Sequence, residues 1–594
     1  MNLVHLIKSA IQQAVFALYQ KQLSVDELPI NETKPEFTGD YTLVTFGLSK
    51  LLQKKPDEIA HELGNYLVAN DALFTEMEVI KGFLNLSIKD SFLLEFLATH
   101  FQQSNYGHSE LGDKKIMVEY SSPNTNKPLH FGHLRNIFLG HAVSAILKNV
   151  GHEVIKVNLI NDRGIHICKS MIAWQLFANK QTPTDAHVKG DHFVGDYYVK
   201  FNDEYKSQMA TLMAEGMPED EAAKKAPIML AAQDMLRQWE AGDADTLALW
   251  KTMNDWVYAG FEVSYQKLGI TFDRYYYESN TYLSGKSIVE KALKNNLLFQ
   301  KEDHSVWIDL SDAGLDQKLL LRGDGTSVYM TQDIGTAILK YLDYHMDQSV
   351  YVIGDEQNYH MQVLKLILQK MQEPCADGIQ HLSYGMVELP SGKMKSREGT
   401  VVDADDMVDE MIAIAKKNTE DLGKVDGFTS EELQQLYQTL GLGALKFYLL
   451  RVDPKKKMIF NPEESIDFHG FTGPFVQYSH ARICSILRKA SIESLPAELS
   501  VSDITLSSIE KNLLKLIAQY PTTIYQAAKE MNPSIVCNVV YQVAKEFNGF
   551  LVDHSVLKAS DESVKNMRLQ LCLLSKQVIA HGLNLLGIAA PERM

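Results

Sequence analysis

The sequence has few of the features that mark secreted, fibrous or membrane proteins. Its 594 residues contain five cysteines, spread from Cys168 to Cys572 with no C-x-x-C pair, so neither a disulfide framework nor a cysteine-based zinc site is predicted. No apolar run approaches the ~20 residues that a membrane span needs. The first 19 residues place apolar side chains at helical spacing between polar ones, which predicts an amphipathic helix rather than a signal peptide. A cytoplasmic location fits these absences best.

Positive charge is also scarce. Lys and Arg number 58 against 75 Asp and Glu, a net charge of −17. This balance argues against a protein coated in nucleic acid but allows one local basic face on a large enzyme. The hydrophobic fraction of 45% and the charged fraction of 22% exclude a wholly disordered chain, a collagen-like fibre and a coiled-coil rod.

The chain divides into three parts. Residues 1–112 are expected to form a small α+β domain, with helices near Tyr41–Leu52 and Pro56–Asn70 and a strand at Gly82–Ile88. Residues 113–427 are expected to form an α/β domain, with a helical insertion at about 175–262 whose function the sequence does not indicate. Residues 428–594 are expected to form an all-α helical bundle without strands.

The middle part begins with a β-loop-α-β pattern. Ile116–Tyr120 alternates like a strand, Phe131–Val150 is helical and Glu153–Ile160 is again strand-like, with later strands at Ser349–Ile353 and Leu382–Glu388. This pattern predicts a doubly wound, Rossmann-type parallel sheet. The right-handed crossover would place the loop after the first strand at the carboxyl end of the sheet, where small-molecule sites form.

The sharpest motif is His130-Phe131-Gly132-His133, which opens the first predicted helix. A helix N-terminus offers free N–H groups and a partial positive charge to phosphate, and Gly132 allows an adenine ring to approach the backbone. Two imidazoles could donate hydrogen bonds to an α-phosphate. The alternative is a pair of capping or metal-binding histidines.

A second motif is the Gly-bounded run Gly392-Lys393-Met394-Lys395-Ser396-Arg397-Glu398-Gly399-Thr400. Three cations in such a loop could fold over a polyphosphate, but basic surface loops are common. Together the two motifs resemble those of the class I aminoacyl-tRNA synthetases.

Further segments narrow the resemblance to the arginyl-tRNA synthetases. These segments occur in order along the whole chain and are residues 34–41, 118–130, 325–333, 354–360, 473–482 and 586–594. The resemblance implies a class I synthetase fold and an ATP-dependent arginine–tRNA ligase. Such an enzyme forms arginyl-adenylate from arginine and Mg²⁺-ATP, and then transfers arginine to the 2′-OH of the terminal adenosine of its tRNA.

The resemblance also assigns residues to the substrate arginine. The expected contacts are Glu119, Asn124, Tyr329, Asp333 and Gln357. The chemistry agrees, because a planar guanidinium with five donors calls for carboxylates and an aromatic wall. Each residue has a plainer alternative: Glu119 could pair locally, Tyr329 could be core and Gln357 could be a surface amide.

A third set is assigned to ATP and to the transition state. The resemblance implies nucleotide contacts from His130, Gly132, His133, His360, Met386, Val387, Lys393, Met394 and Arg397. The second motif departs from the family pattern, because Ser396 stands where a lysine is usual. Lys127, just before the first motif, is expected to compensate, so the catalytic set is His130, His133, Lys127 and Lys393. The segment Asn161–His166 also departs from the family pattern and receives no assignment.

Residues 446–490 form a local basic region, with eight Lys/Arg against four Asp/Glu. Phosphate and unpaired bases could be contacted there by Lys455, Lys456, Tyr478 and Arg482, and aromatics such as Tyr448, Phe460 and Phe475 could stack on bases. The alternative is a solvated bundle face over core aromatics. The expected partners are arginine, ATP and tRNA, with no membrane and no resident metal, and the expected state is a monomer.

Three other functions remain open. A small-molecule adenylyltransferase would need no helical anticodon block. A non-catalytic tRNA-binding relative would be expected to have lost His130, His133 or Asp333, and all three are present. Another class I specificity is the last alternative, which an aminoacylation assay with competing amino acids would separate.

Overall fold

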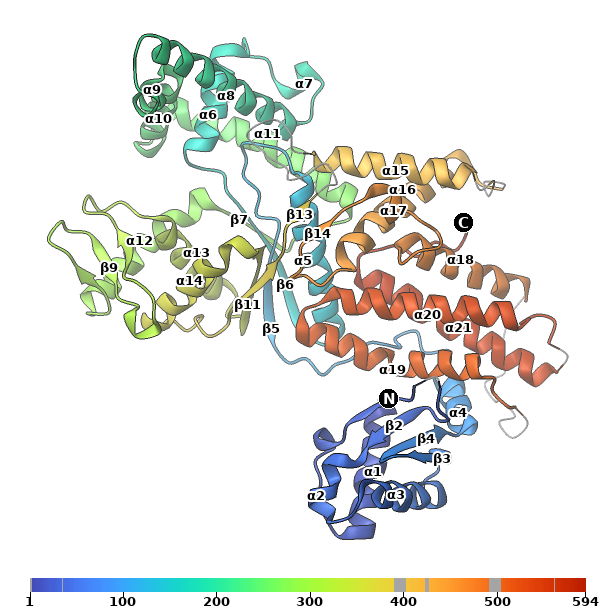
Figure 1. Cartoon of the computed structure of the whole chain (residues 1–594). Coiled ribbons are helices and arrows are strands. Elements are labelled where there is room, and N and C mark those ends of the chain that lie inside the picture. The colour runs from blue at the N-terminus through green and yellow to red at the C-terminus, as the bar shows by residue number, and fades with distance from the viewer. Residues whose placement is uncertain are drawn as a thin grey trace.

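The computed structural model describes residues 3–34, 36–388, 402–421, 423, 427–490, 504–559 and 561–594. A parallel sheet of five strands in the order β12-β11-β5-β6-β7 lies at its centre (Figure 1). Its strands are β5 (Lys115–Glu119), β6 (Glu153–Ile160), β7 (Arg274–Tyr277), β11 (Gln348–Gly354) and β12 (Ile379–Tyr384). All four pairings are parallel, so the doubly wound class I synthetase fold is confirmed.

The order of the strands reverses at β5. From β5 the chain builds outward through β6 and β7, and it later returns to β5 on the other side with β11 and then β12. Such a topological switch point opens a crevice at the carboxyl ends of the two strands beside it. Here those ends are Glu119 on β5 and Gly354 on β11, and Tyr351 pairs with Glu119 in the register.

Helix α5 (Phe131–Asn149) explains how the sheet is joined to the rest of the chain. It contacts β5, β6 and β11 on one side and the helices α15, α16, α19, α20 and α21 on the other. The buried residues of α5 lie on all of its faces. This distribution is typical of a fully buried helix, whereas a surface helix buries only one face. The first motif stands at its N-terminus and faces the crevice.

Beyond β7 the chain adds a small helical and antiparallel unit. Its elements are α12 (Glu278–Lys294), β8 (Phe299–Gln300), β9 (Val306–Ile308), β10 (Lys318–Leu321), α13 (Tyr329–Tyr344) and α14 (Asn358–Lys370). The insertion between β6 and β7 consists of α6 (Ile165–Phe177), α7 (Pro183–Ala186), α8 (Gly190–Ala214), α9 (Glu219–Lys225), α10 (Pro227–Glu240) and α11 (Ala244–Leu268).

The C-terminal part is a bundle of helices that packs against α5. It contains α15 (Ala404–Asp421), α16 (Ser430–Leu450), α17 (Pro462–Ser465), α18 (Gly473–Lys489), α19 (Ser508–Glu530), α20 (Pro533–Asp553) and α21 (Glu562–Leu585). The expectation of no strand here was wrong. The short β14 (Met458–Ile459) pairs with β13 (Val387–Glu388), because backbone just after β12 runs beside the loop that follows α16.

The N-terminal part is a four-stranded antiparallel sheet with helices. Its elements are α1 (Leu3–Tyr19), β1 (Ile30–Glu32), β2 (Tyr41–Val44), α2 (Ser49–Leu52), α3 (Pro56–Asn70), β3 (Phe74–Ile80), β4 (Phe83–Ile88) and α4 (Asp90–His100). The helix predicted at Tyr41–Leu52 was wrong over its first four residues. Tyr41–Val44 pairs with β1 and β4, so sheet formation overrides the local preference.

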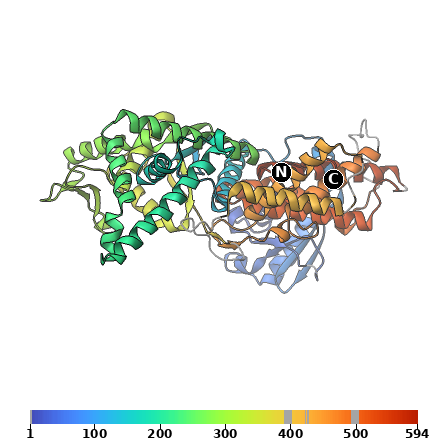
Figure 2. The same cartoon turned by 90° about the horizontal axis from the view of Figure 1, so that it is seen from above.

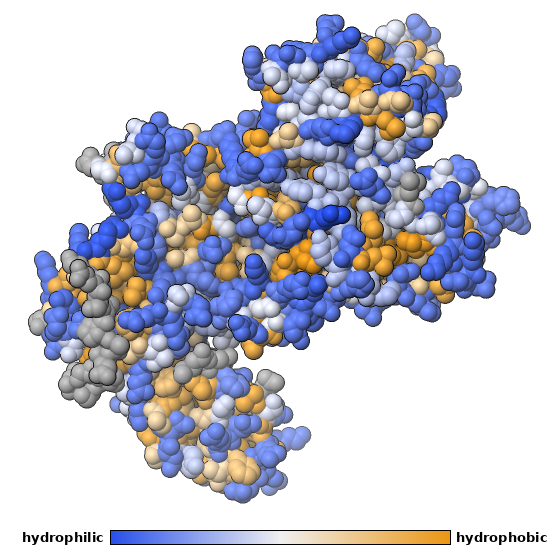
Figure 3. Space-filling view, turned by 180° about the vertical axis from the view of Figure 1, so that it is seen from behind, coloured by the Kyte–Doolittle hydropathy of each residue, from blue (hydrophilic) through white to orange (hydrophobic). Residues whose placement is uncertain are grey.

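The parts are arranged around the sheet. Seen from above, the insertion and the unit that follows β7 lie on one side and the C-terminal helices on the other, with the N-terminal part beneath the latter (Figure 2). Figure 3 shows hydrophilic residues over most of the rear face, interrupted by hydrophobic patches. Within the described residues, no helix combines the length and the apolar character that a bilayer crossing requires. All five cysteines are buried, with free thiols.

Candidate active site

A cavity of about 390 Å³ opens at the switch point, between the ends of β5 and β11 and the helices α13 and α14. Five of the predicted site residues line it together: Glu119, His133, Asp333, Gln357 and His360. They come from segments more than 200 residues apart in the sequence. The fold therefore brings predicted arginine contacts and predicted nucleotide contacts into one space.

One face of α13 supplies three polar or charged side chains to this cavity. Asp333, Thr336 and Lys340 follow each other at positions i, i+3 and i+7, so they share a helix face, and all three line the cavity. Asp333 is accessible, with 37% of its side chain exposed. Its Oδ2 atom lies 2.6 Å from Nε2 of His360 on α14. This hydrogen bond raises the pKa of His360 although partial burial opposes the shift.

Lys340 is a charged residue of the cavity that the sequence reasoning missed. Its side chain is fully buried and its ammonium forms an ion pair with Oε2 of Glu119, whose side chain is 5% exposed. Burial lowers the pKa of Lys340, but the Glu119 carboxylate outweighs it and the pKa is raised. The helical period could have found this residue, because Lys340 stands two turns after Asp333 on the same face.

A second titratable group near the cavity was also missed. Glu278, the first residue of α12, is half-buried, and burial raises the pKa of its carboxyl to about 7. Asp333 and Asp162 raise this pKa further and Arg163 opposes them. Asp162 is itself buried and accepts hydrogen bonds from Ser279 and Tyr258. Asp162 belongs to the segment Asn161–His166, which departs from the family pattern, and it links α12 to α11 of the insertion.

The two histidines of the first motif lie ring against ring, with centroids 3.8 Å apart. His130 is the N-cap of α5, and its backbone N–H donates to Nδ1 of His133 at 3.0 Å. Nδ1 of His133 therefore has the capping role that was the alternative to phosphate binding. Burial lowers the pKa of both rings, that of His130 to about 3, and the nearby Lys127 ammonium adds to the shift. Both imidazoles are neutral at physiological pH.

The tautomer of His133 follows from that hydrogen bond. A neutral imidazole carries one proton, and a ring nitrogen that accepts a hydrogen bond cannot carry it. Because Nδ1 of His133 accepts, the proton is on Nε2. His133 lines the cavity, so the motif supplies a neutral N–H donor at the N-terminus of α5.

His130 and Lys127 line a neighbouring cavity of about 250 Å³ with residues of α8. Burial lowers the pKa of the Lys127 ammonium. Backbone bonds join the chain before α5 to the chain before α15, because Phe131 N–H donates to the Val402 carbonyl and Ala404 N–H to the Leu129 carbonyl. The chain at Val402 and Ala404 is thus anchored beside the first motif.

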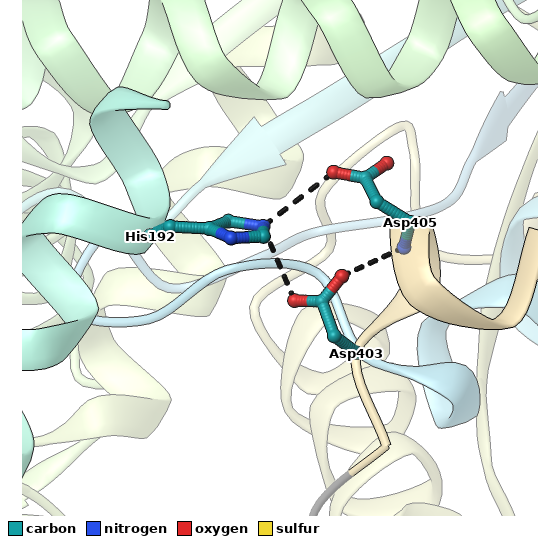
Figure 4. Close-up of side chains that lie close together, drawn as sticks. All are labelled: His192, Asp403 and Asp405. Carbon is teal, nitrogen blue, oxygen red and sulfur yellow. Dashed lines mark hydrogen bonds and ion pairs between the residues drawn. The ribbon is translucent and has the colours of Figure 1, made fainter. Parts of the chain in front are cut away.

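An ion-pair cluster ties the insertion to this anchor (Figure 4). His192 Nε2 on α8 lies 3.2 Å from Asp403 Oδ2 and 3.5 Å from Asp405 Oδ2. Lys189 also pairs with Asp405, and Ser264 on α11 donates to the same carboxylate. The hydrogen bond to Asp405 raises the pKa of His192. Lys189 also lies 3.2 Å from Oδ2 of the buried Asp191, so the cluster contains three carboxylates around Lys189 and His192.

Other predicted residues lie outside the cavity or outside the described residues. Asn124 bridges to Asn161 at the mouth of the sheet. Tyr329 is 76% exposed at the start of α13 and does not line the cavity. The Met386 carbonyl accepts a hydrogen bond from Met458, and Val387 is buried. The contacts predicted for Lys393, Met394 and Arg397 lie outside the described residues. A Cβ added at Gly132 would meet only the His130 ring.

The predicted tRNA residues fall into two places. Tyr478 and Arg482, one turn apart on α18, line a cavity with Phe468, His469, Phe475 and Met594. Lys455 and Lys456 are exposed in the loop between α16 and β14. The stacking role suggested for Tyr448 and Phe460 was wrong, because both are core residues, 5% and 0% exposed. Lys446, counted in the basic region, is also buried and donates to the Gly587 carbonyl.

Comparison with known families assigns all three parts of the chain. Residues 96–461 match the family model described as tRNA synthetases class I (R), catalytic domain. The chain belongs to the arginyl-tRNA synthetase family. Residues 2–88 match the arginyl tRNA synthetase N terminal domain and residues 476–594 match the DALR anticodon binding domain.

Similar proteins support the same family along the full length. A protein of Bacteroides thetaiotaomicron named arginine–tRNA ligase is 49% identical over 582 residues, covering 97% of both chains. One of Flavobacterium psychrophilum with the same name is 49% identical over 607 residues, covering all of both. The solved arginyl-tRNA synthetase of Thermus thermophilus has a TM-score of 0.78 at 25% identity and covers 100% of both chains.

Proposed function

We propose that this member of the arginyl-tRNA synthetase family is an arginine–tRNA ligase that works at the cavity between β5 and β11. The carboxylate of arginine attacks the α-phosphate of ATP, which enters as its Mg²⁺ complex, and pyrophosphate leaves. The 2′-OH of the terminal adenosine of tRNA then attacks the aminoacyl carbonyl, and AMP leaves. The observation that carries the proposal is the accessible Asp333 carboxylate in the same cavity as the His133 N–H donor.

Arginine would bind with its guanidinium toward Asp333. A carboxylate can accept two parallel N–H bonds from a guanidinium, which an ammonium cannot match in geometry. Glu119 and Gln357 line the same cavity and would accept further donors. Asn124 and Tyr329 stay proposed contacts from the family resemblance, since they stand at the edge of the site.

ATP would lie toward the N-terminus of α5. The neutral His133 ring can donate a hydrogen bond from its Nε2–H to the α-phosphate and needs no positive charge to do so. The partial positive charge of the helix N-terminus stabilises the negative charge of the phosphate. Lys127 adds a cation beside His130. Lys393 and Arg397, with Met394, would approach from the segment 389–401, and His360, Met386 and Val387 would bound the nucleotide.

The tRNA would contact both ends of the chain. We assign residues 1–112 to an N-terminal tRNA-contacting domain, 113–427 to the catalytic domain and 428–594 to the anticodon-binding domain. The groove beside Tyr478 and Arg482 offers an aromatic ring and a guanidinium one turn apart, which suits an unpaired base and its phosphate. Lys455 and Lys456 would add phosphate contacts. A monomer in the reducing cytoplasm fits the five free thiols.

The test is aminoacylation with radiolabelled arginine, lysine, glutamine and cysteine, together with ATP–pyrophosphate exchange. We expect charging of tRNA with arginine alone, and exchange only when tRNA is present. Preferential charging with another amino acid would overturn the proposal. Robust exchange without tRNA would overturn only the requirement for tRNA.

A further inference from the structure

The buried Lys340–Glu119 ion pair has no role in the reaction outlined above. We infer that Lys340 is a positioning residue for arginine recognition, which holds the Glu119 carboxylate ionised and fixed at the wall of the arginine cavity. This inference rests on the proposed function, because it names arginine as the ligand of the cavity.

The first argument is the place of the pair. Glu119 is the last residue of β5 at the switch point, and Lys340 stands on the α13 face that also carries Asp333. Both side chains line the cavity although they are 5% and 0% exposed. An ion pair placed only to fasten α13 to the sheet could lie anywhere along their contact, whereas this one lies at the wall of the site.

The second argument is electrostatic. A carboxylate that loses this much water is driven toward its neutral form unless a cation is beside it. The Lys340 ammonium provides that cation, and the rings of Tyr351 and Tyr276, with centroids 4.8 and 5.8 Å from Nζ, surround the ammonium. Protonated Glu119 would present a hydroxyl to a guanidinium that has only donors, so keeping Glu119 ionised matters for this ligand.

The third argument is charge matching. Asp333 and Glu356 also line the cavity, and Glu119 is the carboxylate that a buried cation neutralises, so the wall keeps the Glu119 acceptor oxygens without a third uncompensated negative charge beside a ligand side chain of charge +1. Ion pairs that must be desolvated are favourable only when their geometry is fixed in advance. Lys340 provides this fixation through the Oε2 atom.

Other titratable groups face the pair and will contribute to any pH dependence. They are Asp333 on α13, His360 on α14, Glu356 after β11, Tyr351 on β11, Tyr276 on β7 and His133 on α5. Because wild type and variants share all of them, the informative quantity is the ratio of the arginine dissociation constants of variant and wild type at each pH.

The experiment is calorimetric titration of the full-length protein with L-arginine between pH 6 and 9. For Lys340→Met we expect about a tenfold weaker affinity at pH 7. The ratio to wild type should fall as pH rises, because burial without a cation favours the neutral form of a carboxyl and higher pH restores the charge. Lys340→Arg should restore most of the affinity and remove the pH dependence of the ratio.

The matched control is Lys446→Met. Lys446 is another buried lysine, but it donates to the Gly587 carbonyl in the helical part of the chain. We expect this variant to bind arginine as wild type does. An unchanged or tighter affinity in Lys340→Met, or an equal loss in Lys446→Met, would overturn the inference.

If Lys340→Met does not fold, the same titration is carried out with the double variant Lys340→Met/Glu119→Gln, which removes both buried charges. We expect weak arginine binding with no pH dependence relative to wild type. Wild-type affinity in the double variant would mean that the pair serves folding alone, and would overturn the inference. Absence of arginine binding by the wild-type protein would instead overturn the proposed function.

Discussion

Two buried lysines, one beside the catalytic sheet and one in the helical bundle, have pKa values shifted in opposite directions. Lys340, at the switch point, pairs with a carboxylate, and this attraction raises its pKa despite burial. Lys446, between α5, α16 and the chain's end, donates to a backbone carbonyl, and burial lowers its pKa to about 8. A counterion therefore decides whether the pKa of a buried lysine rises or falls. At neutral pH Lys340 carries its charge beside a carboxylate, whereas Lys446 carries its charge beside a backbone carbonyl.

The largest effect should come from removing the Asp333 carboxylate, which lies on the cavity face of α13. Asp333→Asn keeps the shape but loses the charged acceptor for the guanidinium, so kcat/KM for arginine should fall by about a hundredfold or more. Steady-state aminoacylation at saturating ATP and tRNA measures this. Asp409→Asn, on the exposed face of α15, is the control and should leave kcat/KM unchanged. Wild-type kcat/KM in Asp333→Asn would contradict the placement of the guanidinium.

Stability measurements test whether the counterion explains the difference between the two lysines. Lys340→Met leaves the Glu119 carboxylate buried without a cation, which should destabilise the protein by about 3–5 kcal/mol. Lys446→Met leaves only the Gly587 carbonyl unpaired, at a cost of about 1–2 kcal/mol. Thermal unfolding midpoints under identical conditions should therefore fall more for Lys340→Met. An equal or larger fall for Lys446→Met would show that the counterion does not set the difference.

The smallest effect concerns His360, whose pKa is raised by its bond to Asp333. Because the folded-state pKa lies above the unfolded one, the ionic contribution of this pair is fully present below about 6.5. It is lost as pH rises through the raised value. Protonated His360 competes with the guanidinium for Asp333, so the KM for arginine should decrease severalfold as pH rises through this range.

The check is the pH profile of KM in His360→Asn. This variant should lose the slope, because asparagine does not titrate, while its KM at high pH stays close to that of wild type. A slope that persists unchanged in the variant would assign the titration to another group, such as Glu278, whose pKa is about 7.

Local periodicity predicted the elements that carry strong internal signals. The α5 helix and the strands β5, β6 and β11 all follow from apolar spacing. It failed at Tyr41–Val44 and at Met458–Ile459, because these short strands form through pairing with other strands, β1 and β4 for the first and β13 for the second, which local spacing does not reveal. It also misread Tyr448 and Phe460, since an aromatic beside lysines is exposed or buried depending on what packs over it.

The sequence by itself determined the residue types at the site and their order, and through them the family: the two histidines of the first motif, Asp333, and the helical spacing that puts Lys340 on the face of Asp333. Only the tertiary structure decided which charges meet. Glu119 and Lys340 are 221 residues apart, and no pattern in either local sequence indicates that the two charges pair. The reason is physical, because the charge state of a buried group depends on its neighbours in space, and these are set by the register of β5 and β11 and by the packing of α13 against them.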